Sequence, residues 1–357
     1  MSLLQDRIRE ILDCLIVRGR ELGVQVAAYR DGELIVDAWA GTADPRDGEP
    51  VTAQTLFPVF SVTKGIATTV IHRLVERGLL DYGTPLAALW PEFAAHGKEG
   101  VTLEHALRHT AGLWETPPEL TFARMLDWDA ACTVLAAAPP LSPPGERFVY
   151  HAKTFGWLIG EPARRADGRS FSRMVADEIA APLGLKTLFV GLPAPENHPV
   201  AFLVEKGSPD LRTPPPEELA GQPAVKVPLT HQMNTPAMQA ACLPSTNGMM
   251  NARALARHYA ALLPGGVDGV ELLPASRLAA ATQWETREGI TRGLGYERWD
   301  IVLPSGGIEG FGHGGYGGSM GFAFPKLGLA VGYTRNLFGE ESGWSRVIDA
   351  LVSHHSR

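Results

Sequence analysis

Cysteine is scarce in this sequence, and long apolar runs are missing. The 357 residues include three cysteines, Cys14, Cys132 and Cys242, which lie far apart and form no CxxC pair. This pattern excludes a disulfide framework and favours free, buried thiols in a reducing compartment. No stretch approaches the ~20 apolar residues of a membrane span. The N-terminal segment mixes charged residues among its apolar ones, unlike a signal peptide. We therefore expect a cytoplasmic protein that does not insert into membranes.

Positive charge is not in excess either. Lys and Arg number 32 against 39 Asp and Glu, which gives a net charge of -7. Such a chain lacks the basic surface that nucleic acid or anionic lipid requires, so a small-molecule substrate is favoured. With 45% hydrophobic residues and no internal repeat, the chain is long enough for one large enzyme fold or two to three domains. The sequence does not indicate the oligomeric state.

Patterns typical of strands lie at both ends of the chain. Two alternating apolar runs within residues 24–40 flank Asp31-Gly32, a dipeptide that predicts a β-hairpin. Residues 318–336 are glycine-rich and then strand-like, with a turn near Pro325–Gly328. Helical spacing appears at residues 4–15, at 62–78 and again from Trp344 to Leu351.

The middle of the chain alternates helical patterns with proline-rich connectors. We therefore expect an α+β fold, in which an antiparallel sheet is built from the N- and C-terminal segments and flanked by helices. The sheet domain is expected to comprise residues 1–80 and 285–357. A mainly helical domain, residues 81–284, is inserted between these segments, and the active site is expected in the cleft between the two domains.

The first motif with chemical meaning is Ser61-Val62-Thr63-Lys64, which opens a helical pattern after the extended segment 56–60. Residues three apart share one face of a helix, so the Lys64 amine can reach the Ser61 hydroxyl. A half-buried lysine can lose its proton near neutral pH and act as a base. The N–H of a serine at a helix N-terminus is also free to stabilise an oxyanion. The same spacing arises by chance on surface helices, so the motif needs support.

Tyr150 is the second candidate, because it follows a Pro-Gly turn and precedes a helical pattern. Beside a cationic lysine the pKa of its phenol would be lowered, and the phenolate could serve as a general base. A core tyrosine with a satisfied hydroxyl is the alternative.

The third candidate is His313-Gly314-Gly315-Tyr316, which lies before a strand pattern. Small residues there allow a substrate to approach the backbone closely. A flexible glycine-rich loop is the alternative.

In this order and spacing the three motifs resemble the serine β-lactamase and penicillin-binding-protein superfamily, and its family VIII carboxylesterases in particular. The resemblance covers roughly residues 24–336. It implies that Ser61 is the acyl-accepting nucleophile, that Lys64 activates it and that Tyr150 occupies the tyrosine position of the family's Tyr-x-Asn motif. No metal or other cofactor is implied.

The resemblance also implies how a substrate is held. The backbone N–H groups of Ser61 and Tyr316 would form the oxyanion hole. Four residues would line the substrate site: His313, Gly314, Gly315 and Ala152.

Two of these positions depart from the lactamase pattern. Ala152 stands where the Tyr-x-Asn motif has asparagine, and His313 stands where the Lys-Thr-Gly motif has lysine. A mostly neutral imidazole binds a carboxylate less strongly than a permanent cation does, so β-lactams should be poor substrates. We predict a serine hydrolase that cleaves small carboxylic esters through an acyl-Ser61 intermediate.

Several alternatives stay open at this point. Acyl transfer to an alcohol or amine shares the acylation step, and weak β-lactamase or D-amino-acid amidase activity would use the same residues. An inactive binding module would have no need of Ser61, Lys64 and Tyr150 together.

Two further patterns need an explanation. Gly317-x-Ser319-x-Gly321 matches the nucleophile elbow of α/β-hydrolases, but a strand pattern follows it instead of a helix. Three tryptophans either line an apolar acyl pocket or pack in the core, namely Trp114, Trp157 and Trp284.

Overall fold

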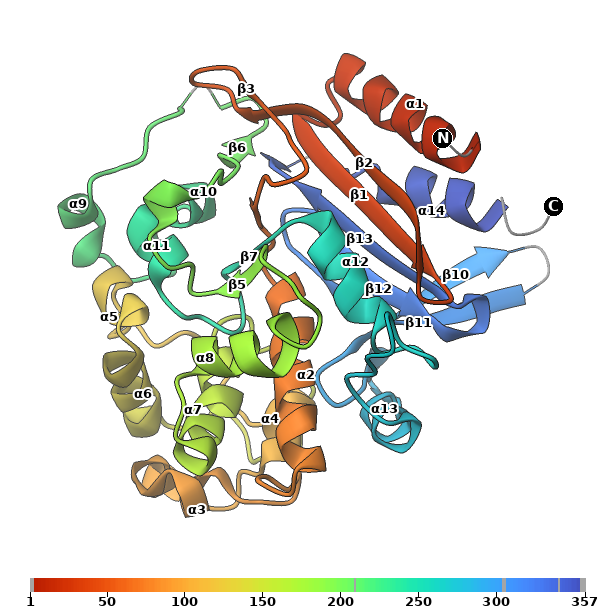
Figure 1. Cartoon of the computed structure of the whole chain (residues 1–357). Helices are drawn as coiled ribbons and strands as arrows, with labels where there is room; N and C mark the ends of the chain where they lie inside the picture. Colours follow the sequence, from red (N-terminus) through yellow and green to blue (C-terminus); the bar gives the residue numbers. More distant parts are fainter. Residues whose placement is uncertain (1–2, 209, 304–305, 340, 354–357) are drawn as a thin grey trace.

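A nine-stranded antiparallel sheet organises the computed structural model, which describes residues 3–208, 210–303, 306–339 and 341–353. The strand order is β3-β2-β1-β13-β12-β11-β10-β9-β8 (Figure 1). Strands from the two chain ends meet where β1 (Gly23–Arg30) pairs with β13 (Leu329–Arg335). The predicted α+β fold, with a sheet built from the N- and C-terminal segments, is confirmed.

The hairpin at the N-terminal side of the sheet forms where the sequence predicts it. Strand β1 pairs with β2 (Glu33–Asp44), and Asp31 and Gly32 between them both have positive φ, 47° and 82°. Two successive positive φ values suit the tight turns that match the strand twist, which explains the Asp-Gly pair.

The remaining strands come mostly from the C-terminal part of the chain. Strand β11 runs beside β12, and a short 3-10 turn at Pro325–Leu327 joins β12 to β13. The bounds of these strands are β3 (Glu49–Pro50), β8 (Glu285–Arg287), β9 (Ile290–Arg292), β10 (Glu297–Leu303), β11 (Gly306–Gly314) and β12 (Met320–Phe324).

Helices cover both faces of the sheet. Helices α1 (Leu3–Val17) and α14 (Trp344–Ser353) pack together over one face, whereas α12 (Ala252–Ala260) and α2 (Val62–Glu76) lie on the other (Figure 1). Because both faces are covered, residues of β1 are buried on alternating sides in two separate apolar clusters. The predicted N-terminal, 62–78 and C-terminal helices are confirmed.

Short helices fill the middle of the chain, together with two small strand groups. A three-stranded sheet has the order β4 (Phe57–Pro58), β7 (Gly248–Met250), β5 (Leu188–Val190), and β6 (Val204–Glu205) pairs in parallel with β14 (Leu337–Phe338). The helices are α3 (Leu86–Leu89), α4 (Leu103–Leu107), α5 (Phe122–Leu126), α6 (Trp128–Ala137), α7 (Phe155–Asp167), α8 (Phe171–Val175), α9 (Pro216–Ala220), α10 (Leu229–Met233), α11 (Pro236–Ala240) and α13 (Ala275–Ala281). The domain boundaries at residues 80 and 285 stay a prediction, and α12 packs on the sheet although it lies inside 81–284.

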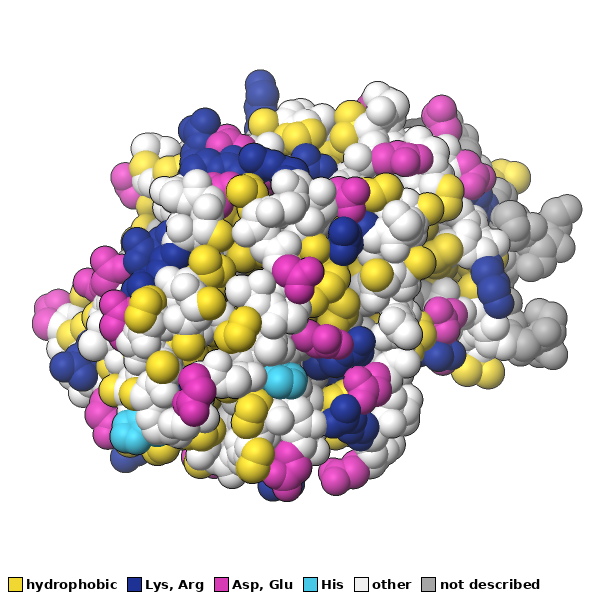
Figure 2. All heavy atoms as spheres, turned by 90° about the horizontal axis from the view of Figure 1, so that it is seen from below, with side chains coloured by type: hydrophobic (Ala, Val, Ile, Leu, Met, Phe, Trp, Pro, Cys, Tyr) yellow, Lys and Arg dark blue, Asp and Glu magenta, His cyan; other side chains and the backbone are white. Residues whose placement is uncertain are grey.

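The cysteines, the helix lengths and the surface charge also bear on the expectations from the sequence. All three cysteines are free, but only Cys132 is buried, whereas Cys14 and Cys242 are half-buried. None of the helices in the described ranges is long and apolar enough to cross a bilayer. On the face shown in Figure 2, acidic and basic side chains are interspersed. The cytoplasmic location stays a prediction.

Candidate active site

Ser61 lies at a sharp bend between the small sheet and helix α2. Strand β4 ends at Pro58, and the Val59 N–H donates to Gly248 O of the neighbouring β7 at 3.0 Å. Phe60 then adopts a left-handed conformation with φ of 50°, which is strained for a bulky residue. Ser61 is the N-cap of α2, as the sequence predicts, so its hydroxyl stands at the positive end of the helix dipole.

Lys64 is completely buried one helical turn further on. Its Nζ lies 3.2 Å from Ser61 Oγ, 2.8 Å from Ala152 O and 2.9 Å from Ser245 O. A neutral amine has two N–H bonds and one lone pair. A carbonyl oxygen can only accept a hydrogen bond, so the two carbonyls accept from the two N–H groups. The lone pair of the amine is then left to accept from the Ser61 hydroxyl.

Burial sets the charge of this amine. It lowers the pKa of Lys64 from 10.5 to about 7, while the negative charge of Glu297 raises it and the positive charge of Arg292 lowers it further. A large fraction of the amine is therefore neutral at pH 7, and this fraction grows as the pH rises. Geometry and charge state together make Lys64 a suitable base for Ser61.

Tyr150 lies beside both Lys64 and Ser61. Lys64 Nζ is 4.7 Å from the centre of the Tyr150 ring, which is a cation–π distance. Burial raises the pKa of Tyr150 above its ordinary value, against the smaller opposing effect of a hydrogen bond with Ser61. The prediction of a lowered pKa was wrong, because desolvation of the phenol outweighs the hydrogen bond with Ser61 and the charge of Arg292. The catalytic role of Tyr150 stays a prediction. The protonated phenol can donate a proton.

The glycine-rich turn after β11 packs against the start of α2. Within it, Gly318 N–H donates to Gly315 O and Gly315 N–H donates to Ser319 O, both at 2.8 Å. A Cβ on Gly315 would come within 2.4 Å of Val59 O, so only glycine allows this approach.

The two backbone N–H groups expected to form the oxyanion hole, those of Ser61 and Tyr316, make no hydrogen bond among the described residues. The turn holding Tyr316 approaches Phe60 and Val62, the residues on either side of Ser61, so the two segments that carry these N–H groups are neighbours. Such a pair is suited to an oxyanion.

His313 is the penultimate residue of strand β11, and it is only 1% exposed. Its Nδ1 lies 2.7 Å from Gly314 O, and because a carbonyl only accepts, this nitrogen carries the proton. Burial lowers the pKa of His313 to about 4, so the ring is neutral at pH 7. The remaining nitrogen, Nε2, is a buried acceptor without a partner among the described residues.

An ion pair that the sequence analysis did not single out lies beside these groups. Arg292 donates to Glu297 at 2.5 Å, across the register pair that joins β9 to β10, and its guanidinium carbon is 5.2 Å from the centre of the Tyr150 ring. Glu297 also accepts from Gly314 N–H at 3.3 Å. Its pKa is about 2: burial would raise it, but His313, which is protonated at such low pH, together with Arg292 and the hydrogen bonds lowers it. The carboxylate is therefore ionised and neutralises the arginine.

Two buried histidines, His109 and His151, pack next to Tyr150. His109 lies 4.9 Å from the Tyr150 ring, centroid to centroid, and its Nδ1 accepts from His151 N–H at 3.0 Å. The His151 ring accepts from Leu113 N–H at 3.1 Å. Both rings are buried, and desolvation lowers the pKa of each below its ordinary value, so they act as neutral hydrogen-bonding groups.

The other expected substrate contacts take these positions. The Ala152 side chain is exposed, while its carbonyl holds Lys64. Gly314 and Gly315 connect β11 to the turn.

Ser319 behaves as a structural residue. It is buried, and its hydroxyl accepts from Arg335 N–H at 3.3 Å. Strand β12 follows directly, so the strand-turn-helix geometry of a nucleophile elbow is absent at this described position.

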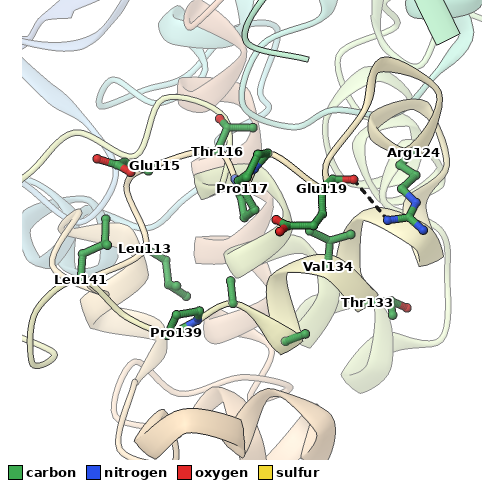
Figure 3. Close-up of a pocket in the computed structure, with 13 residues that line it drawn as sticks. Leu113, Glu115, Thr116, Pro117, Glu119, Arg124, Thr133, Val134, Pro139 and Leu141 are labelled. Carbon is green, nitrogen blue, oxygen red and sulfur yellow. Dashed lines mark hydrogen bonds between the residues drawn. The ribbon is translucent and has the colours of Figure 1, made fainter. Parts of the chain in front are cut away.

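An apolar pocket of about 570 Å³ is lined by the segment from Leu113 to Glu119 and by helix α6 with the residues that follow it (Figure 3). Leu113 belongs to its wall, and its carbonyl accepts from the Thr154 hydroxyl at 2.6 Å, close to the Tyr150 segment. None of the three tryptophans considered above lines this pocket. Trp157 is buried in the apolar core, and the partly buried Trp284 packs against that core. The other lining residues are Glu115, Thr116, Pro117, Pro118, Glu119, Arg124, Thr133, Val134, Ala137, Ala138, Pro139 and Leu141.

Comparison with known proteins agrees with this geometry. The family model described as Beta-lactamase matches residues 4–353. Esterase/beta-lactamase LipL of Mycobacterium tuberculosis is 35% identical over 342 residues, which are 88% of this chain and 77% of that protein.

Solved structures give the same result. The crystal structure of a family VIII carboxylesterase has a TM-score of 0.86 and 32% identity, covering 99% of this chain and 98% of that one. A penicillin-binding protein homologue from Caulobacter crescentus has a TM-score of 0.85 and 35% identity, with the same coverage. The match over nearly the whole chain shows that this protein belongs to the β-lactamase family.

Proposed function

We propose that this protein is a carboxylic ester hydrolase that acts through an acyl-enzyme on Ser61. The observation that carries the proposal is the environment of the Lys64 amine, whose two carbonyl partners leave its lone pair for the Ser61 hydroxyl. The names of relatives, which include esterases, point to the same chemistry.

Acylation begins when neutral Lys64 accepts the Ser61 proton. Ser61 Oγ then attacks the ester carbonyl carbon, and the negative charge that develops on the carbonyl oxygen is stabilised by the N–H groups of Ser61 and Tyr316. When the carbon–oxygen bond of the ester breaks, the protonated Tyr150 phenol donates its proton to the departing alcohol. Lys64 then passes the proton that it took from Ser61 to the Tyr150 phenolate, which restores both groups to their initial protonation states.

Deacylation repeats these steps with water in place of Ser61. Water attacks the acyl carbon, its proton passes to the Lys64 and Tyr150 pair, and the Ser61 oxygen leaves and is reprotonated. The carboxylic acid is released and the site returns to its initial charge state.

The charges around the site favour a neutral ester over a β-lactam. His313 is neutral at pH 7, and its unpartnered nitrogen is an acceptor, which does not attract a carboxylate. Arg292 is the nearby cation, but Glu297 already neutralises it. At position 152 the side chain is a methyl group, so no amide is available for an acylamino substituent.

The experiment compares two serine variants on p-nitrophenyl butyrate. Ser61→Ala should reduce kcat/KM about 10³-fold or more, because covalent catalysis is lost. Ser319→Ala is the matched control and should keep most of the activity. Full activity in Ser61→Ala together with an inactive Ser319→Ala would overturn the proposal.

A fluorophosphonate probe followed by intact-mass measurement provides a second test. One adduct on the wild type and none on Ser61→Ala is the expected result. An unlabelled wild type would instead favour the binding-module alternative.

A further inference from the structure

Tyr316 combines two properties that are unusual in one residue. Its side chain is 74% exposed, although it is large and aromatic. Its backbone N–H is the second oxyanion donor of the proposed mechanism. The exposed ring therefore belongs to the same residue as the N–H that would bind the ester oxygen.

The ring is held in place by other aromatic residues. It meets the Phe338 ring edge-to-face, with centroids 5.3 Å apart, and Phe338 lies 5.8 Å from Phe60. Phe60 directly precedes Ser61 and is buried, Phe338 is half-buried and Tyr316 is exposed. We call these three residues the aromatic platform.

Three separate elements fix the aromatic platform. Phe60 lies at the bend before α2, and Tyr316 lies in the turn between β11 and β12. Phe338 belongs to β14, which pairs in parallel with β6, and Lys206 N–H, directly after β6, donates to Phe338 O at 2.8 Å. Gly317 allows the turn to approach, since a Cβ there would lie 2.9 Å from the Phe60 ring.

We propose that the aromatic platform is a subsite for a planar, apolar ring in the ester substrate, with Tyr316 as its contact surface; this rests on the proposed function. An exposed aromatic ring binds another flat ring better than a puckered one, because stacking and edge-to-face contacts both need a flat π-system. The subsite ends at the oxyanion donor, so the bound ring is one that is close to the scissile carbonyl. The protein should therefore prefer arylalkyl esters to cycloalkyl esters of equal size.

Two matched substrate pairs test this preference. Benzyl acetate and cyclohexylmethyl acetate differ in a ring on the alcohol side, and ethyl phenylacetate and ethyl cyclohexylacetate differ on the acyl side. A methylene group separates ring and ester in all four compounds. The measured quantity is the ratio of kcat/KM within each pair, compared between the wild type and Tyr316→Leu, so that intrinsic differences in reactivity cancel.

In one pair we expect the wild-type ratio to exceed that of Tyr316→Leu by about two- to tenfold in favour of the aromatic ester. The pair that responds identifies the side of the ester that the aromatic platform holds. Tyr316→Phe is the conservative control and should keep the wild-type ratio, because it keeps the ring. Phe338→Leu removes the edge-to-face support and should lower the ratio in the same pair.

Equal ratios in the wild type and in both leucine variants would overturn the subsite while leaving the hydrolase intact. A wild type without Ser61-dependent cleavage of p-nitrophenyl butyrate would overturn the proposed function instead, and the subsite with it.

Discussion

Replacing Lys64 with methionine should change how the free energy of unfolding depends on pH. In the folded protein the pKa of Lys64 is about 7, because burial disfavours the ammonium, whereas in the unfolded chain it returns to the ordinary 10.5. Between these two values the unfolded chain binds more protons than the folded protein. The free energy of unfolding of the wild type therefore rises with pH in this range, relative to a variant without the lysine.

The size of this change follows from the two pKa values. Each pH unit between them is worth about 1.4 kcal/mol, less near the ends of the range. From pH 7 to pH 9 the free energy of unfolding of the wild type should gain about 2 kcal/mol on that of Lys64→Met. Below about pH 6 the lysine is protonated in both states, so the difference should be constant.

The slope with pH is the informative quantity, because methionine has a second effect. It leaves the carbonyls of Ala152 and Ser245 without their donor, which destabilises the variant by a similar amount at every pH.

Urea unfolding at pH 6, 7, 8 and 9 and constant ionic strength provides the measurement. Lys326→Met, which removes an exposed lysine, is the control for the loss of a lysine as such. A difference between the wild type and Lys64→Met that stays constant from pH 6 to pH 9 would refute the reasoning. Lys64 would then be an ammonium at neutral pH and could not accept the Ser61 proton.

Three further predictions concern catalysis. Wild-type kcat/KM should rise with pH toward a plateau above about 7, as Lys64 loses its proton. Glu297→Gln should move this rise to lower pH and Arg292→Gln should move it to higher pH, because the two charges act on the pKa of Lys64 in opposite directions. Unmoved profiles in both variants would contradict the assigned electrostatics. Tyr150→Phe should lower kcat about 10²- to 10⁴-fold with the circular dichroism spectrum unchanged, whereas a kcat within a factor of two of the wild type would remove the phenol from the mechanism. His313→Lys should raise the ratio of kcat/KM for nitrocefin to that for p-nitrophenyl butyrate, about 10-fold or more for one restored charge-assisted contact; a wild-type ratio that already favours nitrocefin would refute the ester preference.

The parts of the structure that can be predicted from the sequence are those determined by residues close together along the chain. Asp31-Gly32 determines a turn by its own conformational preferences, and the hairpin follows. Ser61 and Lys64 are one helical turn apart, so their approach requires only that the helix forms. Tyr150 comes near them through the tertiary fold, and it was singled out because the three motifs occur in a recognisable order.

The partners of Lys64 could not be found in this way. Ala152 and Ser245 act through their carbonyl oxygens, which every residue possesses, so no side-chain pattern marks them. The pair of Arg292 and Glu297 depends on the register of β9 against β10. Strand β11 was not predicted either, because its many glycines hide the alternation of a strand.

The error about Tyr150 has a more general cause. A cationic lysine expected beside a phenol suggests that the phenol is ionised, but the sequence does not reveal how much water the fold removes from around the hydroxyl. In this site the loss of water sets the direction of the pKa shift for three groups, whereas at Glu297 the positive partners and hydrogen bonds outweigh it. The loss of water raises the pKa of Tyr150 and lowers those of Lys64 and His313.

Together these pKa shifts determine the net charge of the site to which a substrate binds. Above about pH 7 the lysine is largely a neutral amine, the phenol keeps its proton and the imidazole is neutral, while Glu297 balances Arg292. An uncharged ester therefore enters a site without an unpaired charge, whereas an anionic substrate would leave water and gain no cation in return. The same burial that makes the lysine a base thus also selects against charged substrates, which links the catalytic group to the preference for esters.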